Sequence, residues 1–100
     1  MSGRRLRNGY LARVTVHVPP SMEDLIPPET MLAMTSRILW ELNGLPADAN
    51  VDAYYYATEG VLLDYGDLWH AQGRFAHARV AIRLNPPNVV TIRVTLTEIE

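Results

Sequence analysis

Cysteine and lysine are both absent from this sequence of 100 residues. Without cysteine there can be no disulfide and no thiolate metal ligand, and nothing in the sequence indicates an oxidising compartment. Without lysine, all nine basic residues are arginine. Because arginine codons are GC-rich, we interpret this bias as the mark of a GC-rich bacterium or of its phage. A chemical origin stays open, because arginine pairs bidentately and stacks on rings where lysine does not.

Long hydrophobic runs are also missing, and those present, such as residues 61–63, are too short to cross a membrane. The basic start of the chain leads into an alternating pattern rather than into an apolar signal region, so we expect a cytoplasmic protein. The net charge of −2 argues against a general polyanion binder, since such proteins usually carry a strong basic excess.

The length fits one domain with a modest core. Hydrophobic residues make up 48% of the chain and charged residues 20%, which is typical of a folded domain rather than of a disordered tail. We expect residues 1–8 to form a flexible basic arm and residues 9–100 to form a single α+β domain.

Three segments alternate between apolar and polar residues with the period of a half-buried strand. They are residues 9–18, 75–84 and 90–97. The first segment ends at Pro19-Pro20, because proline cannot donate to a strand ladder. The other two are separated by Asn85-Pro86-Pro87-Asn88, which predicts a hairpin with one apolar and one polar face.

One main helix is predicted after Pro27-Pro28-Glu29, since proline is tolerated in a first turn and glutamate is favoured there. Apolar residues then recur at three- or four-residue steps from Met31 to Leu45, as on a core-facing helix.

Residues 51–58 are interpreted as a further strand, with a hairpin turn at Glu59-Gly60 and another strand over residues 61–65. Residues 64–72 are left open between a helix and a loop. The predicted fold is therefore α+β, with the sequence order β-α-β-β-β-β. It has a mainly antiparallel sheet of four to five strands, with the one main helix packed on one face.

A single helix covers one face of such a sheet, so the other face must meet water or a partner. Alternation places arginine, histidine and threonine on that face, with Arg74 beside them, and it adds two tyrosines from the strand predicted over residues 51–58. The acidic residues fall mostly elsewhere. The predicted partner-binding residues are Tyr54, Tyr56, Arg13, His17, His77, Arg79, Arg83 and Arg93.

This surface favours a non-enzymatic domain that binds a partner protein, or a second copy of itself, through the sheet face or a sheet edge. The edge over residues 89–100 is the expected seam for self-association. A module that binds single-stranded nucleic acid with the same face is the alternative, because aromatic rings stack on bases and arginines hold phosphates. In the simplest interpretation, the face is merely solvated.

Catalytic motifs are not evident. The three serines fit no nucleophile elbow, and the six glycines are scattered singly rather than gathered in a phosphate-binding loop. Asp64, Asp67 and His70 recur every three residues and could be imagined as a small hydrolytic or metal site, but Gly66 interrupts them. We expect no catalytic residue, cofactor, metal site, membrane contact or small-molecule substrate.

Overall fold

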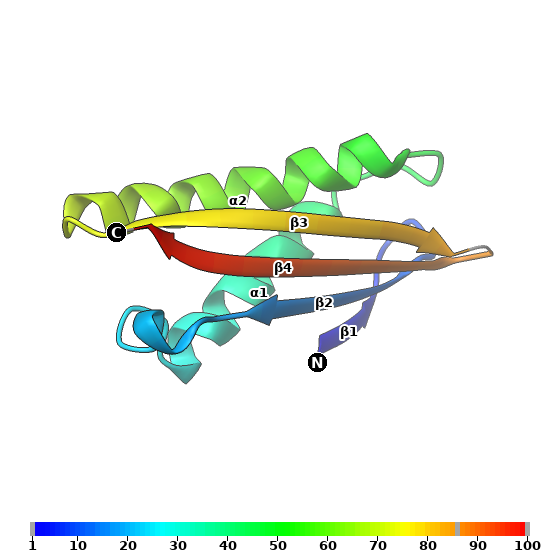
Figure 1. Ribbon diagram of the computed structural model, residues 1–100. Helices are drawn as coiled ribbons and strands as arrows, with labels where there is room; N and C mark the ends of the chain where they lie inside the picture. The colour runs from blue at the N-terminus through cyan, green and yellow to red at the C-terminus, as the bar shows by residue number, and fades with distance from the viewer. Residues whose placement is uncertain (1, 86, 100) are drawn as a thin grey trace.

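The computed structural model describes residues 2–85 and 87–99. In chain order, the elements are β1 (Ser2–Arg5), β2 (Leu11–His17), the short 3-10 helix η1 (Pro20–Met22), α1 (Pro28–Leu42), α2 (Val51–Ala71), β3 (Phe75–Asn85) and β4 (Val89–Ile99). Four strands form one sheet in the order β1-β2-β4-β3 (Figure 1).

The sheet is mixed but mostly antiparallel. β1 pairs antiparallel with β2, and β3 pairs antiparallel with β4 from Phe75↔Ile99 to Asn85↔Val89. The central pair, β2 and β4, is parallel, with His17 opposite Thr95. The α+β class is confirmed, whereas the order along the chain is β-β-α-α-β-β rather than the predicted β-α-β-β-β-β.

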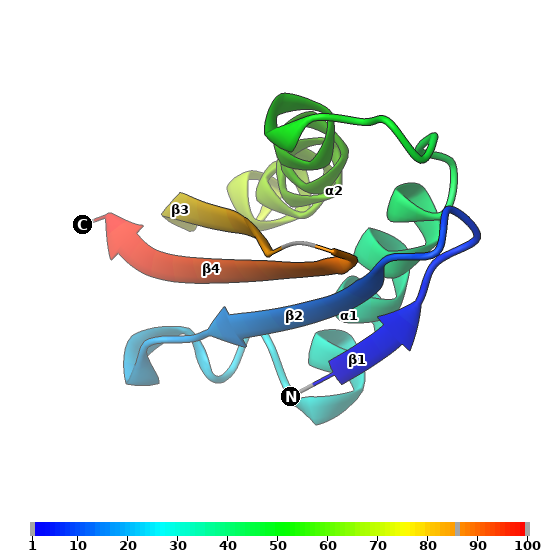
Figure 2. The ribbon, with the colours of Figure 1, turned by 90° about the vertical axis from the view of Figure 1, so that its right-hand side faces the viewer.

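One aliphatic face of the sheet forms half of the core. Alternate residues of β2 and β4, such as Val14, Ile92 and Val94, are buried there. Both helices contribute buried residues to the same cluster, including Ile38 from α1 and Val61 from α2. The helices therefore cover one face together, and in the described part of the chain no α-helix covers the opposite face of the sheet (Figure 2).

The expectation of a flexible arm over residues 1–8 is wrong for the residues described. Arg4 lies opposite Ala12 in the ladder between β1 and β2. Leu6 is buried, and its backbone N–H donates to the carbonyl of Tyr10 at 2.7 Å. Gly9 makes this turn with φ of 95°, a value that glycine adopts without steric strain. Residue 1 lies outside the described part of the chain.

The strands predicted over residues 51–58 and 61–65 are also wrong, because both segments belong to α2. The Asn50 side chain caps this helix by accepting a hydrogen bond from the Ala53 N–H at 3.1 Å. Tyr54, Thr58, Val61 and Trp69 are buried along one side, which is a helical period rather than a strand alternation. Residues 64–71, left open between helix and loop, are helical.

The free edge of the sheet also differs from the expectation. β4 lies between β2 and β3, so the segment predicted as an exposed edge is an interior strand. The edges are β1, with four residues, and β3, with 11 residues. β3 is therefore the long edge in the described sheet.

Tyr54 should be a core residue and Tyr56 a surface residue. Tyr54 is 0% exposed, and its hydroxyl accepts a hydrogen bond from Asn8 Nδ2 at 2.9 Å, whereas Tyr56 is 68% exposed. We predict that Tyr54→Ala lowers the free energy of unfolding by about 3–5 kcal/mol, and that Tyr54→Phe lowers it by about 1 kcal/mol. Tyr56→Ala should stay within about 0.5 kcal/mol of the original chain. Urea unfolding measures all three, and equal losses for the two alanine variants would contradict this assignment.

Candidate functional site

The uncovered face of the sheet, called the open face below, consists of the odd-numbered residues of its strands. These are residues 3 and 5 of β1, 11–17 of β2, 75–85 of β3 and 89–99 of β4. The predicted alternation is confirmed there, since exposed residues alternate with buried or half-buried ones along β3 and β4. Six predicted partner-binding residues are exposed on this face: Arg13, His17, His77, Arg79, Arg83 and Arg93.

Arginines on the open face are separated by small neutral residues. Thr91 of β4 lies between Arg13 of β2 and Arg83 of β3, and these two arginines are about 10 Å apart at the backbone, or two strand spacings. In the same way, Arg93 lies between Thr15 and Ala81. No two arginines are direct cross-strand neighbours in the described ladders, so the arrangement spreads positive charge over the whole face.

Acidic residues do not balance this charge locally. Asp and Glu occupy none of the open-face positions that the structure describes. Arg5 of β1 adds a fifth arginine, which sequence reasoning missed because it assigned β1 to the arm. The open face therefore carries a positive local potential although the chain as a whole has a net charge of −2.

Tyr54 and Tyr56 are not on the open face, and this part of the prediction is wrong. Both lie on α2, on the other side of the sheet, with Tyr54 in the core and Tyr56 on the outer surface of the helix. Phe75, at the start of β3, has an open-face position in the ladder, but its ring lies against α2, with its centroid 4.8 Å from that of His70, and lines the pocket between α2 and β3.

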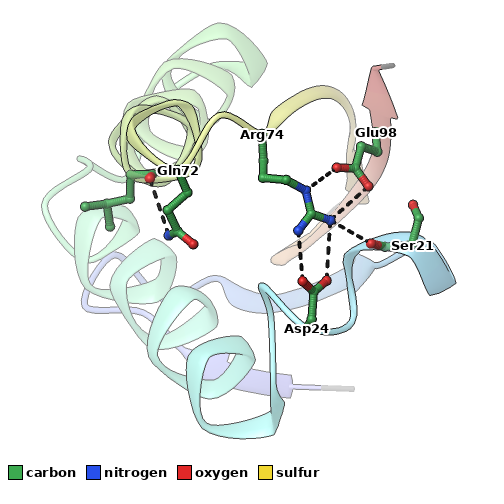
Figure 3. A network of polar contacts seen from close by, with 6 residues as sticks. Ser21, Asp24, Gln72, Arg74 and Glu98 are labelled. Atoms are coloured by element: carbon green, nitrogen blue, oxygen red, sulfur yellow. Dashed lines mark hydrogen bonds and ion pairs between the residues drawn. The ribbon is translucent and has the colours of Figure 1, made fainter.

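Arg74 does not belong to the open face either. Its guanidinium binds Asp24 Oδ2 at 2.8 Å, Glu98 Oε2 at 2.5 Å and the Ser21 carbonyl at 2.8 Å (Figure 3). Hydrogen bonds from Arg74 hold the pKa values of Asp24 and Glu98 below their ordinary range. This Arg74 cluster joins η1 and the turn after η1 to the ends of β3 and β4. We therefore assign the cluster a structural role.

A groove of about 480 Å³ lies between α2 and β3. Leu62, Leu63 and Gly66 line it from the helix, and Ala76 and Ala78 line it from the strand. The glycine and the two alanines are small enough to leave space between the two elements. Sequence reasoning missed the groove because it interpreted this part of α2 as strands, although the helical spacing of residues 59, 62, 63 and 66 carries the signal.

The lining of the groove is mostly apolar. Leu63 is 61% exposed, a large fraction for a leucine beside a cavity. Glu59 and Asp67 lie among the lining residues on the helix side. Because the order of the described sheet ends at β3, the groove opens along a strand edge that no other strand covers.

The candidate hydrolytic residues do not converge. Asp64 forms an ion pair with Arg37 at 2.8 Å, whereas Asp67 and His70 line the groove. His17 and His77 are separated by β4 rather than adjacent. Within residues 2–85 and 87–99, no three His, Asp or Glu side chains are arranged to hold a metal ion. No helix of that part of the chain combines the length and the hydropathy needed to cross a bilayer.

Comparison of the chain with protein-family models, with curated proteins and with solved structures gives no match. A fold alone does not imply an activity, and the open face and the groove are the surfaces of this chain that bear on its function.

The Arg74 cluster predicts a pH dependence of stability. Since the folded-state pKa values of Asp24 and Glu98 are lowered, their contribution is present above the ordinary carboxyl pKa range and is lost as the pH falls through the lowered values. We predict that Arg74→Gln is less stable than the original chain at neutral pH, and that this difference narrows at about pH 3. Urea unfolding at both pH values measures it.

Arg37→Gln provides the matched control. Arg37 and Asp64 form a single ion pair whose side chains are 48% and 58% exposed. Loss of this ion pair should therefore change the free energy of unfolding little at either pH. If Arg74→Gln lowers the free energy of unfolding by the same amount at both pH values, the assigned role of Asp24 and Glu98 is wrong.

Proposed function

We propose that this chain is a non-enzymatic protein-interaction domain that binds an acidic protein segment through the open face and the adjoining edge of β3. The observation that carries the proposal is the set of five arginines on an uncovered sheet face without a carboxylate at any described position. Charges arranged in this way steer and select a partner of opposite sign.

The neighbouring groove favours a protein over other polyanions. Protein interfaces combine an apolar centre with arginine and a polar rim. Here Leu63 and the small residues of β3 supply apolar surface beside the arginines. A nucleic-acid backbone would use the arginines but would leave this apolar surface unoccupied.

Nucleic acid remains the second candidate because of the same arginines. Non-specific single-strand binding, however, relies on aromatic platforms along the path of the strand. Tyr54 and Tyr56 lie on α2, away from the open face. The two tyrosines that were expected to stack on bases are therefore absent from this face. A cytoplasmic location is part of our proposal and is supported by the cysteine-free sequence.

A peptide-display selection tests this function and does not require the natural partner to be identified first. Random 12-residue peptides are selected on the immobilised chain in the presence of excess single-stranded DNA. We predict that the recovered peptides are enriched in Asp and Glu and that their affinity falls as salt rises. Arg79→Glu/Arg93→Glu should weaken their binding by about tenfold or more while the Tm is nearly unchanged.

Arg4→Glu/Arg7→Glu is the matched control, because it changes the net charge equally outside the open face. This variant should retain binding. Selection of peptides without acidic residues, or equal losses for both double variants, would count against the proposal. Tight binding of the DNA competitor that depends on Arg79 and Arg93 would favour the nucleic-acid candidate instead.

A further inference from the structure

The long free edge of β3 and the groove beside it meet at one place. β3 has 11 residues and is paired on one side only, with β4, in the described sheet. An edge strand of this length is a template for another strand, since its outer backbone groups can pair with a second chain. A strand added there would place alternate side chains on the two faces of the sheet.

On the helix side, such a strand would meet the groove. Ala76, Ala78 and Val80 of β3 line it together with Leu63 of α2. The side chains that enter from the added strand would therefore be apolar and of modest size. The groove therefore specifies every second residue of the partner segment, namely those that face the helices.

On the open face, the same strand would lie next to His77, Arg79 and Arg83. Their neighbours on β4 are Thr97, Thr95 and Thr91, so no carboxylate in the described ladder neutralises the two arginines from the other side. Carboxylates at the alternate positions of an added strand would complement them.

Gly66 points to close approach by a partner. A glycine inside a helix lowers helix stability by roughly 1 kcal/mol relative to alanine. A Cβ at residue 66 would meet no atom within 4 Å apart from those of its chain neighbours and of its own helix backbone, so packing against the rest of the described chain does not require glycine there. Gly66 lines the groove, where the missing side chain leaves room for an incoming strand. Gly60 is equally open, but it is exposed and does not line the groove.

We propose that the partner presents an extended segment in which apolar residues alternate with Asp or Glu, and that this segment adds to the free edge of β3 with its apolar side chains in the groove beside Gly66. The proposal rests on the proposed function and specifies the conformation and the chemistry of the partner.

A second copy of this chain is the competing occupant, and its charges oppose it. In an antiparallel pairing of two β3 strands centred on Val80, with both open faces on one side, each Arg79 is diagonal to the other. Centring on Arg79 or on Ala81 places Arg79 opposite Arg79 or opposite Arg83. Like charges directly opposite each other destabilise such a pair.

Two fluorescent nine-residue peptides of identical composition test the proposal. In one, valine alternates with glutamate; in the other, the valines and the glutamates form two blocks. Fluorescence anisotropy should show about tenfold tighter binding of the alternating peptide, because only its pattern fits both faces. Amide hydrogen exchange in β3 should slow when the alternating peptide is bound, since edge amides become paired.

Gly66→Ala and Gly60→Ala form a matched pair of variants. Both should raise the Tm, because alanine favours the helix and both sites are open. Gly66→Ala should lower the affinity for the alternating peptide by about tenfold, because the added methyl group overpacks the groove. Gly60→Ala should leave this affinity unchanged. A variant that is more stable yet binds less well separates a binding role from a structural one.

Each other outcome overturns the inference. If the two peptides bind equally well and both lose affinity for the Arg79→Glu/Arg93→Glu variant, the attraction is electrostatic and involves no strand addition. The proposed function would then still stand. Absence of binding by both peptides would remove strand addition, and the display selection would then decide the proposed function separately. A dimer in sedimentation velocity that Gly66→Ala dissociates would assign the edge to a second copy.

Discussion

The aliphatic rows of β2 and β4 have to be covered, and α1 and α2 cover them from the same side of the sheet. Each fully buried valine or isoleucine contributes roughly 1.5–3 kcal/mol relative to exposure, so this packing dominates the stability of the domain. Since side chains alternate along a strand, the same constraint directs every second residue away from the helices. The open face is the direct consequence of this one-sided cover.

Charge follows the same division. Five arginines lie on the open face, whereas described carboxylates such as Asp64 and Glu98 lie on the helix side or at the ends of strands. The two surfaces meet at β3, where basic residues on one face adjoin an apolar groove on the other. A partner that contacts both surfaces would need a two-sided pattern, and a β-strand is the element that supplies one.

Sequence reasoning succeeded where the pattern was regular and failed where two periods overlapped. The alternation in residues 75–84 and 90–97 predicted β3 and β4, and the spacing of Met34, Ile38 and Leu42 predicted α1. In residues 51–65, three consecutive tyrosines imitate a strand and Gly60 imitates a turn. The Asn50 cap and the row of buried residues from Tyr54 to Trp69 show that this segment is a helix with one buried side.

The sequence by itself determined the α+β class and the arginine-rich polar face, because local alternation assigns each residue of a strand to one side or the other. Tertiary structure alone decided that Tyr54 and Tyr56 belong to a second helix, that Arg74 is held by Asp24 and Glu98, and that β3 rather than β4 is the long edge strand. The physical reason is that strand order and the groove depend on contacts between residues far apart along the chain, and no local period encodes such contacts.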